Sequence, residues 1–323
     1  MRFTVFCCAV VSIPWNIFAA QPVLPMAAIA VAVVDANNRP VTNCQVVAII
    51  NGAYGQPITD SSVTMRATPD ARGIARFTNR PSASVQVVVK GAGYYMTHSE
   101  SLFLPSIENG GLLPWHRTNT LVLKAMVNPI PMYAIFLPWT LPETEKAIGF
   151  DLVEGDWTKP FGKGFNADLF FRREFIKRAP KGRGSAITDG EDRYFITFPN
   201  RGDGLVPFTA PEYPRGSELR SAYEAPADGY QAEWTTYRVW SPGKPFESNH
   251  DVKRNFYIRV RTVMDEEGRI TSANYGKIYG ELPNCICYFN PEVNSRNVEF
   301  APDKNLTRKS SSRFPIRWLS TFP

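Results

Sequence analysis

Three acidic residues lie close together in the chain, beside a tryptophan: Asp151, Glu154, Asp156 and Trp157. Paired carboxylates are the groups with which a glycoside hydrolase protonates the leaving group and attacks the sugar, and they must lie about 5–10 Å apart in a cleft. Their spacing in the sequence does not place them in a cleft, and a solvated acidic loop has the same composition. A polysaccharide-acting hydrolase is therefore the alternative hypothesis for this chain.

Other residues that could support catalysis are few. The sequence has three His and five Cys, and it contains no HExxH, Gly-x-Ser-x-Gly or P-loop string. Cys285 and Cys287 form a CxC that places both thiols on one face of a strand, either as two small buried side chains or as one disulfide. Cys44 is expected to be buried and inert. We predict no catalytic residue, no metal site and no cofactor.

Aromatic residues offer material for a binding site instead. The side chains of Trp and Tyr stack on flat ligands and are enriched at interfaces. The candidates are three tryptophans and the polar face of an expected strand near residue 258, namely Trp157, Trp234, Trp240, Tyr257, Arg259 and Arg261. The alternative is that most of these aromatic residues pack in the core or between domains.

The composition excludes several classes of protein. The chain has 323 residues, with 44% hydrophobic and 20% charged residues, which are ordinary globular values. The 36 Lys and Arg residues outnumber the 30 Asp and Glu residues only slightly, and they form no clustered basic stripe. Nucleic-acid binding is therefore not expected. The 27 Pro residues argue against a long helical bundle.

The N-terminus resembles an export signal. Arg2 precedes an apolar stretch over residues 3–13, and the small residues Ala19 and Ala20 follow. We predict a signal peptide over 1–20, with an uncleaved anchor as the alternative, because prolines interrupt a run that is short for a membrane span. The mature protein is then exported to the periplasm, the cell surface or the medium, without a stable membrane span.

Residues 28–125 have the pattern of a β-sandwich. Short alternating apolar runs, such as Ile29-x-Val31-x-Val33 and Val85-x-Val87-x-Val89, are separated by turn-forming segments every 8–12 residues. Turns are expected over residues 35–40 and 70–73. We predict an antiparallel sandwich.

The same residues carry a resemblance to a known family. The strings Asp35…Pro40-Val41…Cys44-x-Val46, Asp70-x-x-Gly73-x-Ala75-x-Phe77 and Val89-x-Gly91-x-Gly93-Tyr94 resemble the carboxypeptidase regulatory-like domain. The resemblance implies a transthyretin-like, carbohydrate-binding-like β-sandwich with no catalytic zinc. Asn38 and Cys44 depart from the residues that this family often has, and both substitutions are compatible with the fold.

The rest of the chain is also predicted to be rich in strands. Prolines punctuate residues 126–145, which we expect to be an extended connector along a domain surface. Residues 146–302 are predicted to form a second β-rich domain with few short helices, including a half-buried hairpin around residues 256–279. This region resembles exported bacterial proteins of unassigned function. Residues 303–323 are expected to be a loose tail or a strap.

These observations predict an all-β, two-domain, exported protein. The leading hypothesis is a non-catalytic binding or structural protein that meets a carbohydrate or a protein partner at the cell surface or in the periplasm. A polysaccharide hydrolase and a membrane-anchored scaffold are the alternatives.

Overall fold

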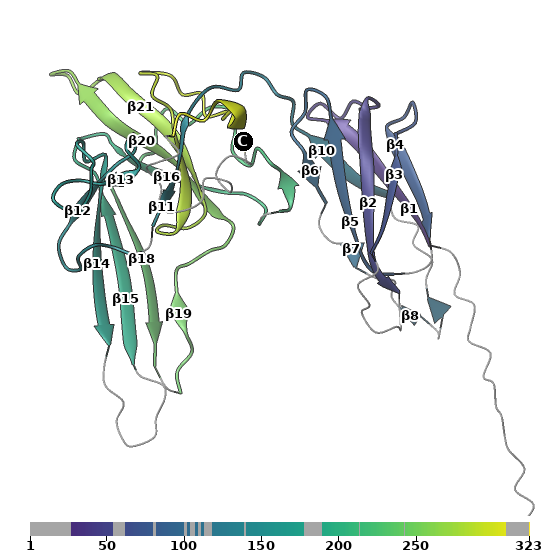
Figure 1. Ribbon diagram of the computed structural model, residues 1–323, viewed down its shortest axis with the longest axis horizontal. Coiled ribbons are helices and arrows are strands. Elements are labelled where there is room, and N and C mark those ends of the chain that lie inside the picture. The colour runs from purple at the N-terminus through teal and green to yellow at the C-terminus, as the bar shows by residue number, and fades with distance from the viewer. Residues whose placement is uncertain are drawn as a thin grey trace, which may run out of the picture.

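The computed structural model describes residues 27–53, 62–79, 82–99, 102–103, 107–108, 111–112, 118–138, 140–177, 189–212, 214–241, 243–307 and 323. The predicted signal peptide and most of the predicted tail lie outside these residues. The chain is an all-β protein, as the sequence predicts, and it forms two sandwiches that Figure 1 shows side by side. Within the described residues, one short 3-10 helix, η1 (Pro302–Lys304), is present. No helix of this part is long and apolar enough to span a membrane.

The first sandwich packs two sheets. The three-stranded sheet has the order β10 (Thr118–Leu123), β1 (Ala27–Asp35), β4 (Ile74–Asn79). The opposite sheet has the order β17 (Gly216–Ser217), β6 (Thr97–His98), β5 (Ser82–Gly91), β2 (Cys44–Ala53), β3 (Ser62–Ala67), and β7 (Leu102–Phe103) also pairs with β5. A separate hairpin contains β8 (Ile107–Glu108) and β9 (Gly111–Leu112). Alternating side chains such as Val31, Val46 and Val87 fill the space between the sheets, as period-2 alternation requires.

The turns of this sandwich take the conformations expected from their residues. Asn38 has φ 59° and Gly73 has φ 75°, so both occupy the left-handed region that Asn and Gly accept. A Cβ atom at Gly73 would lie 2.6 Å from the carbonyl oxygen of Val33. Tyr94, which follows Gly93, packs against the core of this sandwich.

One strand pairing differs from the antiparallel prediction. β1 and β10 are parallel, and their register runs from Ala30 opposite Thr118 to Asp35 opposite Leu123. The first and last strands of a sandwich can pair in this way because the intervening chain returns through the other sheet.

The second sandwich has a five-stranded and a six-stranded sheet. The five-stranded sheet has the order β11 (Tyr133–Leu137), β22 (Cys285–Phe289), β21 (Ile270–Tyr279), β20 (Arg254–Met264), β16 (Gly204–Thr209). The six-stranded sheet has the order β13 (Asp156–Trp157), β12 (Ile148–Asp151), β14 (Leu169–Lys177), β15 (Gly190–Thr197), β18 (Glu233–Trp240), β19 (Glu247–Ser248). The main core lies between them and includes Phe150, Phe171, Ile258 and Phe289.

Part of the predicted connector, residues 126–145, belongs to the second sandwich. Residues 133–137 form β11, which pairs with β22, and Ile135 and Leu137 are buried in the main core. The continuous apolar run Tyr133–Leu137 is typical of a strand that is covered on both faces, and it forms a strand despite the prolines on either side of it. Residues 305–307 form a strap beside β11, where the backbone N–H of Leu306 donates to the carbonyl of Met132.

The five-stranded sheet is covered on both faces. A second cluster, with Met132, Tyr275, Tyr288 and Phe300 among its members, packs on the face opposite the main core. The covering segments include residues 219–230 and 292–301, which have little regular structure. Strands that the sequence suggests to be half-buried, such as β20 and β21, are therefore mostly buried.

The two sandwiches share polar contacts. β17 belongs to the second half of the chain but pairs with β6 of the first sandwich. The buried carboxylate of Glu299 accepts the hydroxyl of Tyr95 and the backbone N–H groups of Val127 and Asn128. These contacts hold the connector at the junction.

Candidate functional site

One face of the six-stranded sheet continues from the core to solvent. Directly opposed residues on neighbouring strands point to the same side, so Arg173, Tyr194 and Thr236 form one row across β14, β15 and β18. Phe175, Asp192 and Arg238 form the next row in the same direction. Figure 1 shows these strands extending beyond the five-stranded sheet, and Phe175 and Arg238 are exposed at this end of the face.

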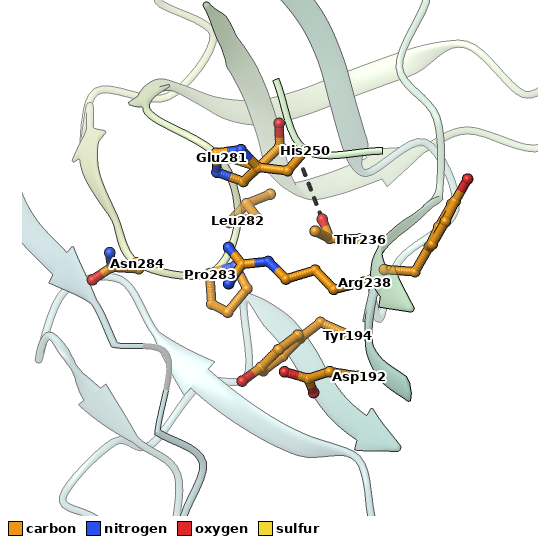
Figure 2. A pocket seen from close by; sticks show the side chains of 10 residues that line it. Asp192, Tyr194, Thr236, Arg238, His250, Glu281, Leu282, Pro283 and Asn284 are labelled. Carbon is orange, nitrogen blue, oxygen red and sulfur yellow. Dashed lines mark hydrogen bonds between the residues drawn. The ribbon is translucent and has the colours of Figure 1, made fainter. Parts of the chain in front are cut away.

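A cavity of about 230 Å³ lies on this face. Its walls come from β15, β18, the segment around His250 and the residues that follow β21, and its lining includes Asp192, Tyr194, Arg238, His250, Glu281 and Asn284. Figure 2 shows the Arg238 side chain between the His250–Glu281 pair and the Tyr194–Asp192 pair, directed toward Pro283. The cavity is smaller than the roughly 300–1,000 Å³ of drug-sized sites, so it suits one small ligand unit.

The segment after β21 is anchored at two points. Leu282 is buried in the main core, and the backbone N–H of Asn284 donates to the carbonyl of Leu137 at 3.0 Å. On the opposite wall, the Asn249 side chain accepts the N–H of Tyr237 and donates to the carbonyl of Thr235. The cavity is thus built from elements that the core and the hydrogen bonds of the sheet edge hold in place.

Glu281 lies on the buried side of the cavity. Its carboxylate accepts the guanidinium of Arg254 at 3.2 Å, the N–H of Asp251 at 3.3 Å and the hydroxyl of Thr236 at 3.5 Å. Burial raises the pKa of this carboxyl, and the positive charge of Arg254 opposes that rise. The Arg254 guanidinium also lies over the Trp234 ring.

Asp192 is likewise engaged by an arginine of the protein. Arg173 donates from Nε to Oδ1 at 2.7 Å and from Nη2 to Oδ2 at 3.0 Å, which is a bidentate pair. The hydrogen bond to Asp192 raises the pKa of Arg173. Arg173 also lies over the rings of Phe175 and Tyr194. The ion pair of Arg173 with Asp192 therefore packs against the side of the cavity that Tyr194 lines.

An aromatic strip adjoins the cavity. It consists of Phe175, which is 45% exposed, and the partly exposed Trp240, whose ring centroids are 6.3 Å apart. Trp240 lies across Gly190, where an added Cβ would be 2.1 Å from the indole ring. The glycine therefore lets the indole lie flat against β15, beside the Arg238 row.

The predicted binding residues do not form one surface. Trp157 is 7% exposed and packs edge-to-face on Phe150 and Phe171, so its prediction as a surface platform is wrong. Trp234 is half-buried against Phe256. Among the three predicted tryptophans, Trp240 lies beside the cavity, on the aromatic strip.

The predicted exposed strand face is also wrong. The hydroxyl of Tyr257 accepts the N–H of Ala222, and Arg259 donates to the carbonyls of Gly202 and Ala227. Both side chains are buried, because residues 219–230 cover this face of β20.

Arg261 points to the other side of the sheet from Arg259. It lies in a β-bulge with φ 57°, and it donates to both carboxylate oxygens of Asp168 at 2.7 and 3.0 Å. A bulge places an extra residue on one strand and thereby reverses the alternation that the sequence indicates.

The acidic cluster that suggested a hydrolase organises a loop. Asp151 is 1% exposed and accepts the backbone N–H groups of Val153, Glu154, Phe165 and Asn166. Burial works to raise the pKa of Asp151, but these hydrogen bonds outweigh it and lower the pKa. Asp156 accepts the N–H groups of Trp157 and Lys163. The accessible carboxylate pair that this hypothesis needs is therefore not provided by Asp151.

The cysteines of the described residues are free and buried: Cys44, Cys285 and Cys287. Burial raises the pKa of all three thiols. In the described part of the chain, no group of three or more His, Cys, Asp and Glu side chains could hold a metal ion.

Sequence reasoning missed most of the cavity. Asp192, Arg238, His250, Glu281 and Asn284 come from four separate segments, and none of them belongs to a motif. The alternation Thr236-x-Arg238-x-Trp240 could have indicated a polar and aromatic strand face, but it does not show which side chains lie opposite it.

Comparisons with known proteins give little further information. No family model matches the chain, and no curated protein matches it. A similar solved structure is the crystal structure of BcpA, the major pilin subunit of Bacillus cereus, with 11% sequence identity and a TM-score of 0.21; the match covers 88% of this chain and 99% of that chain. At this TM-score the likeness carries no argument about function.

Proposed function

We propose that this chain is an exported, non-catalytic binding protein that holds a carbohydrate in the cavity between β15, β18 and residues 281–284. The observation that carries the proposal is the aromatic strip of Phe175 and Trp240 beside a small polar cavity. Aromatic faces stack against sugar rings, and convergent polar groups fix their orientation. The cavity accommodates one ring, and the strip continues along the sheet for a neighbouring ring.

Export is part of the same proposal. It rests on the basic, apolar and small-residue pattern of residues 1–20. The turn strings of residues 28–125 support the further proposal that the first sandwich is a domain of the carboxypeptidase regulatory-like kind. In that arrangement the first sandwich is a support, and the second sandwich carries the ligand.

Glycan-array screening of the full chain tests the proposal, followed by titration calorimetry on the glycans that bind. Trp240→Ala should weaken binding by about tenfold or more, because stacking on the indole is lost. Phe165→Ala is the matched control, since Phe165 is a 72% exposed aromatic side chain on the loop that follows β13. Binding that Trp240→Ala leaves intact, or an array without any bound glycan, would overturn the proposal and favour a protein partner.

A further inference from the structure

The cavity contains two acids, and the protein neutralises both of them. Arg173 occupies both oxygens of Asp192, and Glu281 accepts Arg254 together with the Asp251 N–H. Neither carboxylate therefore presents an unpaired negative charge to a ligand.

Arg238 differs from these two arginines. It is exposed, it lines the cavity, and it makes no ion pair with any residue that the structure describes. Its cross-strand partner is Asp192, whose oxygens are already bound to Arg173. The register of the sheet thus places a guanidinium beside an acid that is already paired.

The two carboxylates of the lining are each paired with an arginine, Asp192 with Arg173 and Glu281 with Arg254. The guanidinium of Arg238 is then a positive charge in the lining that no ion pair among the described residues compensates. The imidazole of His250 also lines the cavity. The side-chain amide of Asn284 is a further donor in the lining.

We propose that the cavity selects carbohydrates that carry a carboxylate, such as uronic acids, and that Arg238 binds this carboxylate. This inference rests on the proposed function and specifies its ligand class. Arg presents a planar fork of donors that matches the two oxygens of a carboxylate. The ring that bears the carboxylate then lies near Tyr194, and the next ring extends toward Trp240.

The test compares two probes that differ only at the carboxyl group, an oligogalacturonate and its uncharged methyl ester. Calorimetry with the full chain should show that the acid binds at least about tenfold more tightly than the ester, because charge-assisted hydrogen bonds are the strong ones. Arg238→Gln should remove this preference and leave the affinity for the ester within about twofold. Arg238→Lys keeps the charge but loses the planar fork of donors. Its preference for the acid over the ester should therefore lie between those of the original protein and of Arg238→Gln.

Arg72→Gln is the matched control, because Arg72 is an exposed arginine of the first sandwich whose loss changes the net charge equally. If Arg72→Gln reduced the preference for the acid as much as Arg238→Gln does, the preference would come from the net charge of the protein, and the inference would be overturned. Equal affinity of the acid and the ester would also overturn it, while leaving carbohydrate binding in place. If neither the acid nor the ester binds, and no glycan on the array binds, the proposed function itself is rejected.

Discussion

The hydroxyl of Tyr95 donates to Oε1 of Glu299 at 2.7 Å, although the two residues are 204 positions apart in the chain. Tyr95 follows β5 of the first sandwich, and Glu299 lies beside the second. The same carboxylate accepts two backbone N–H groups of the connector, at Val127 and Asn128. One buried side chain therefore joins both sandwiches and the segment between them.

Replacement of Glu299 should weaken this junction. Glu299→Ala leaves a buried hydroxyl and two N–H groups without an acceptor, so we expect a loss of about 3 kcal/mol in the free energy of unfolding in urea. Glu299→Gln retains one acceptor oxygen and should cost less, and Tyr95→Phe should cost about 1 kcal/mol. A Glu299→Ala protein as stable as the original would show that the junction contributes nothing to stability.

Asp70 should titrate at an unusually low pH. It accepts the guanidinium of Arg76 and the N–H groups of Ile74 and Arg72, and these hydrogen bonds lower its pKa from 3.8 to about 2. Because the pKa is lowered on folding, the ionised carboxylate stabilises the protein above pH 4, and this stabilisation is lost as the pH falls toward 2. NMR titration of the Asp70 carboxyl measures the midpoint.

Arg76→Gln should raise the midpoint of Asp70, because the arginine is the largest cause of the shift. Arg39→Gln is the control, since Arg39 binds Asp35 on another turn. A midpoint that stays near 2 in Arg76→Gln would contradict this account.

Truncation of Trp157 should reduce the stability of the protein, whereas truncation of Trp240 should reduce glycan binding. Trp157→Ala should cost about 3–5 kcal/mol in the free energy of unfolding, because it opens a cavity among packed aromatic rings. Trp240→Ala, on the ligand face, should cost much less and reduce glycan binding instead. Thermal and urea unfolding of both variants gives the comparison, and a large stability loss in Trp240→Ala would assign it to the core.

Lys277 should be replaceable with a gain in stability. Its side chain is 0% exposed, and its Nζ donates to Ser221 Oγ at 3.5 Å and lies over the rings of Tyr279 and Tyr288. Burial lowers the pKa of this amine, which costs stability at any pH below the ordinary lysine pKa. Lys277→Met should therefore raise the free energy of unfolding by about 1–3 kcal/mol at pH 7.

The gain in Lys277→Met should shrink as the pH rises toward the ordinary lysine pKa of about 10.4, because the unfolded chain then also loses the proton. Lys253→Met is a matched control on an exposed lysine. A destabilised Lys277→Met protein would show that the contacts of the amine with Ser221 and Tyr279 outweigh the cost of its burial.

The buried thiols should resist alkylation in the folded protein. Burial raises the pKa of Cys285 well above its ordinary value and also raises the pKa of Cys44 and Cys287. Iodoacetamide at pH 8 should leave these three residues unmodified until urea unfolds the chain, because the thiolate is the reactive form. Peptide mass mapping identifies each site, and modification of Cys285 or Cys287 before unfolding would contradict their burial.

The sequence predicts where the strands lie better than it predicts which of their faces are buried. The hairpin of β20 and β21 and the turn at Asp70 follow from local alternation and turn residues, and the structure contains both. The alternation also separates Ile258 from Tyr257 and Arg259, and the structure keeps that separation. It does not reveal that residues 219–230 cover the polar face, since that segment has no periodicity of its own.

The site could not be predicted for a related reason. Arg238 faces Asp192 through strand register, and Glu281 reaches the cavity from a turn that follows a different sheet. Register between distant strands depends on packing across the whole sandwich and not on a local pattern. The bulge at Arg261 likewise reverses one side chain without a signal such as a glycine.

The parallel pairing of β1 with β10 has a mechanical consequence. Tension applied through the chain before Ala27 and after Leu123 pulls these neighbouring strands lengthwise in opposite directions. The ladder between them is then loaded in shear, so several hydrogen bonds must break together rather than one at a time. The first sandwich is thereby arranged to withstand stretching along its own chain.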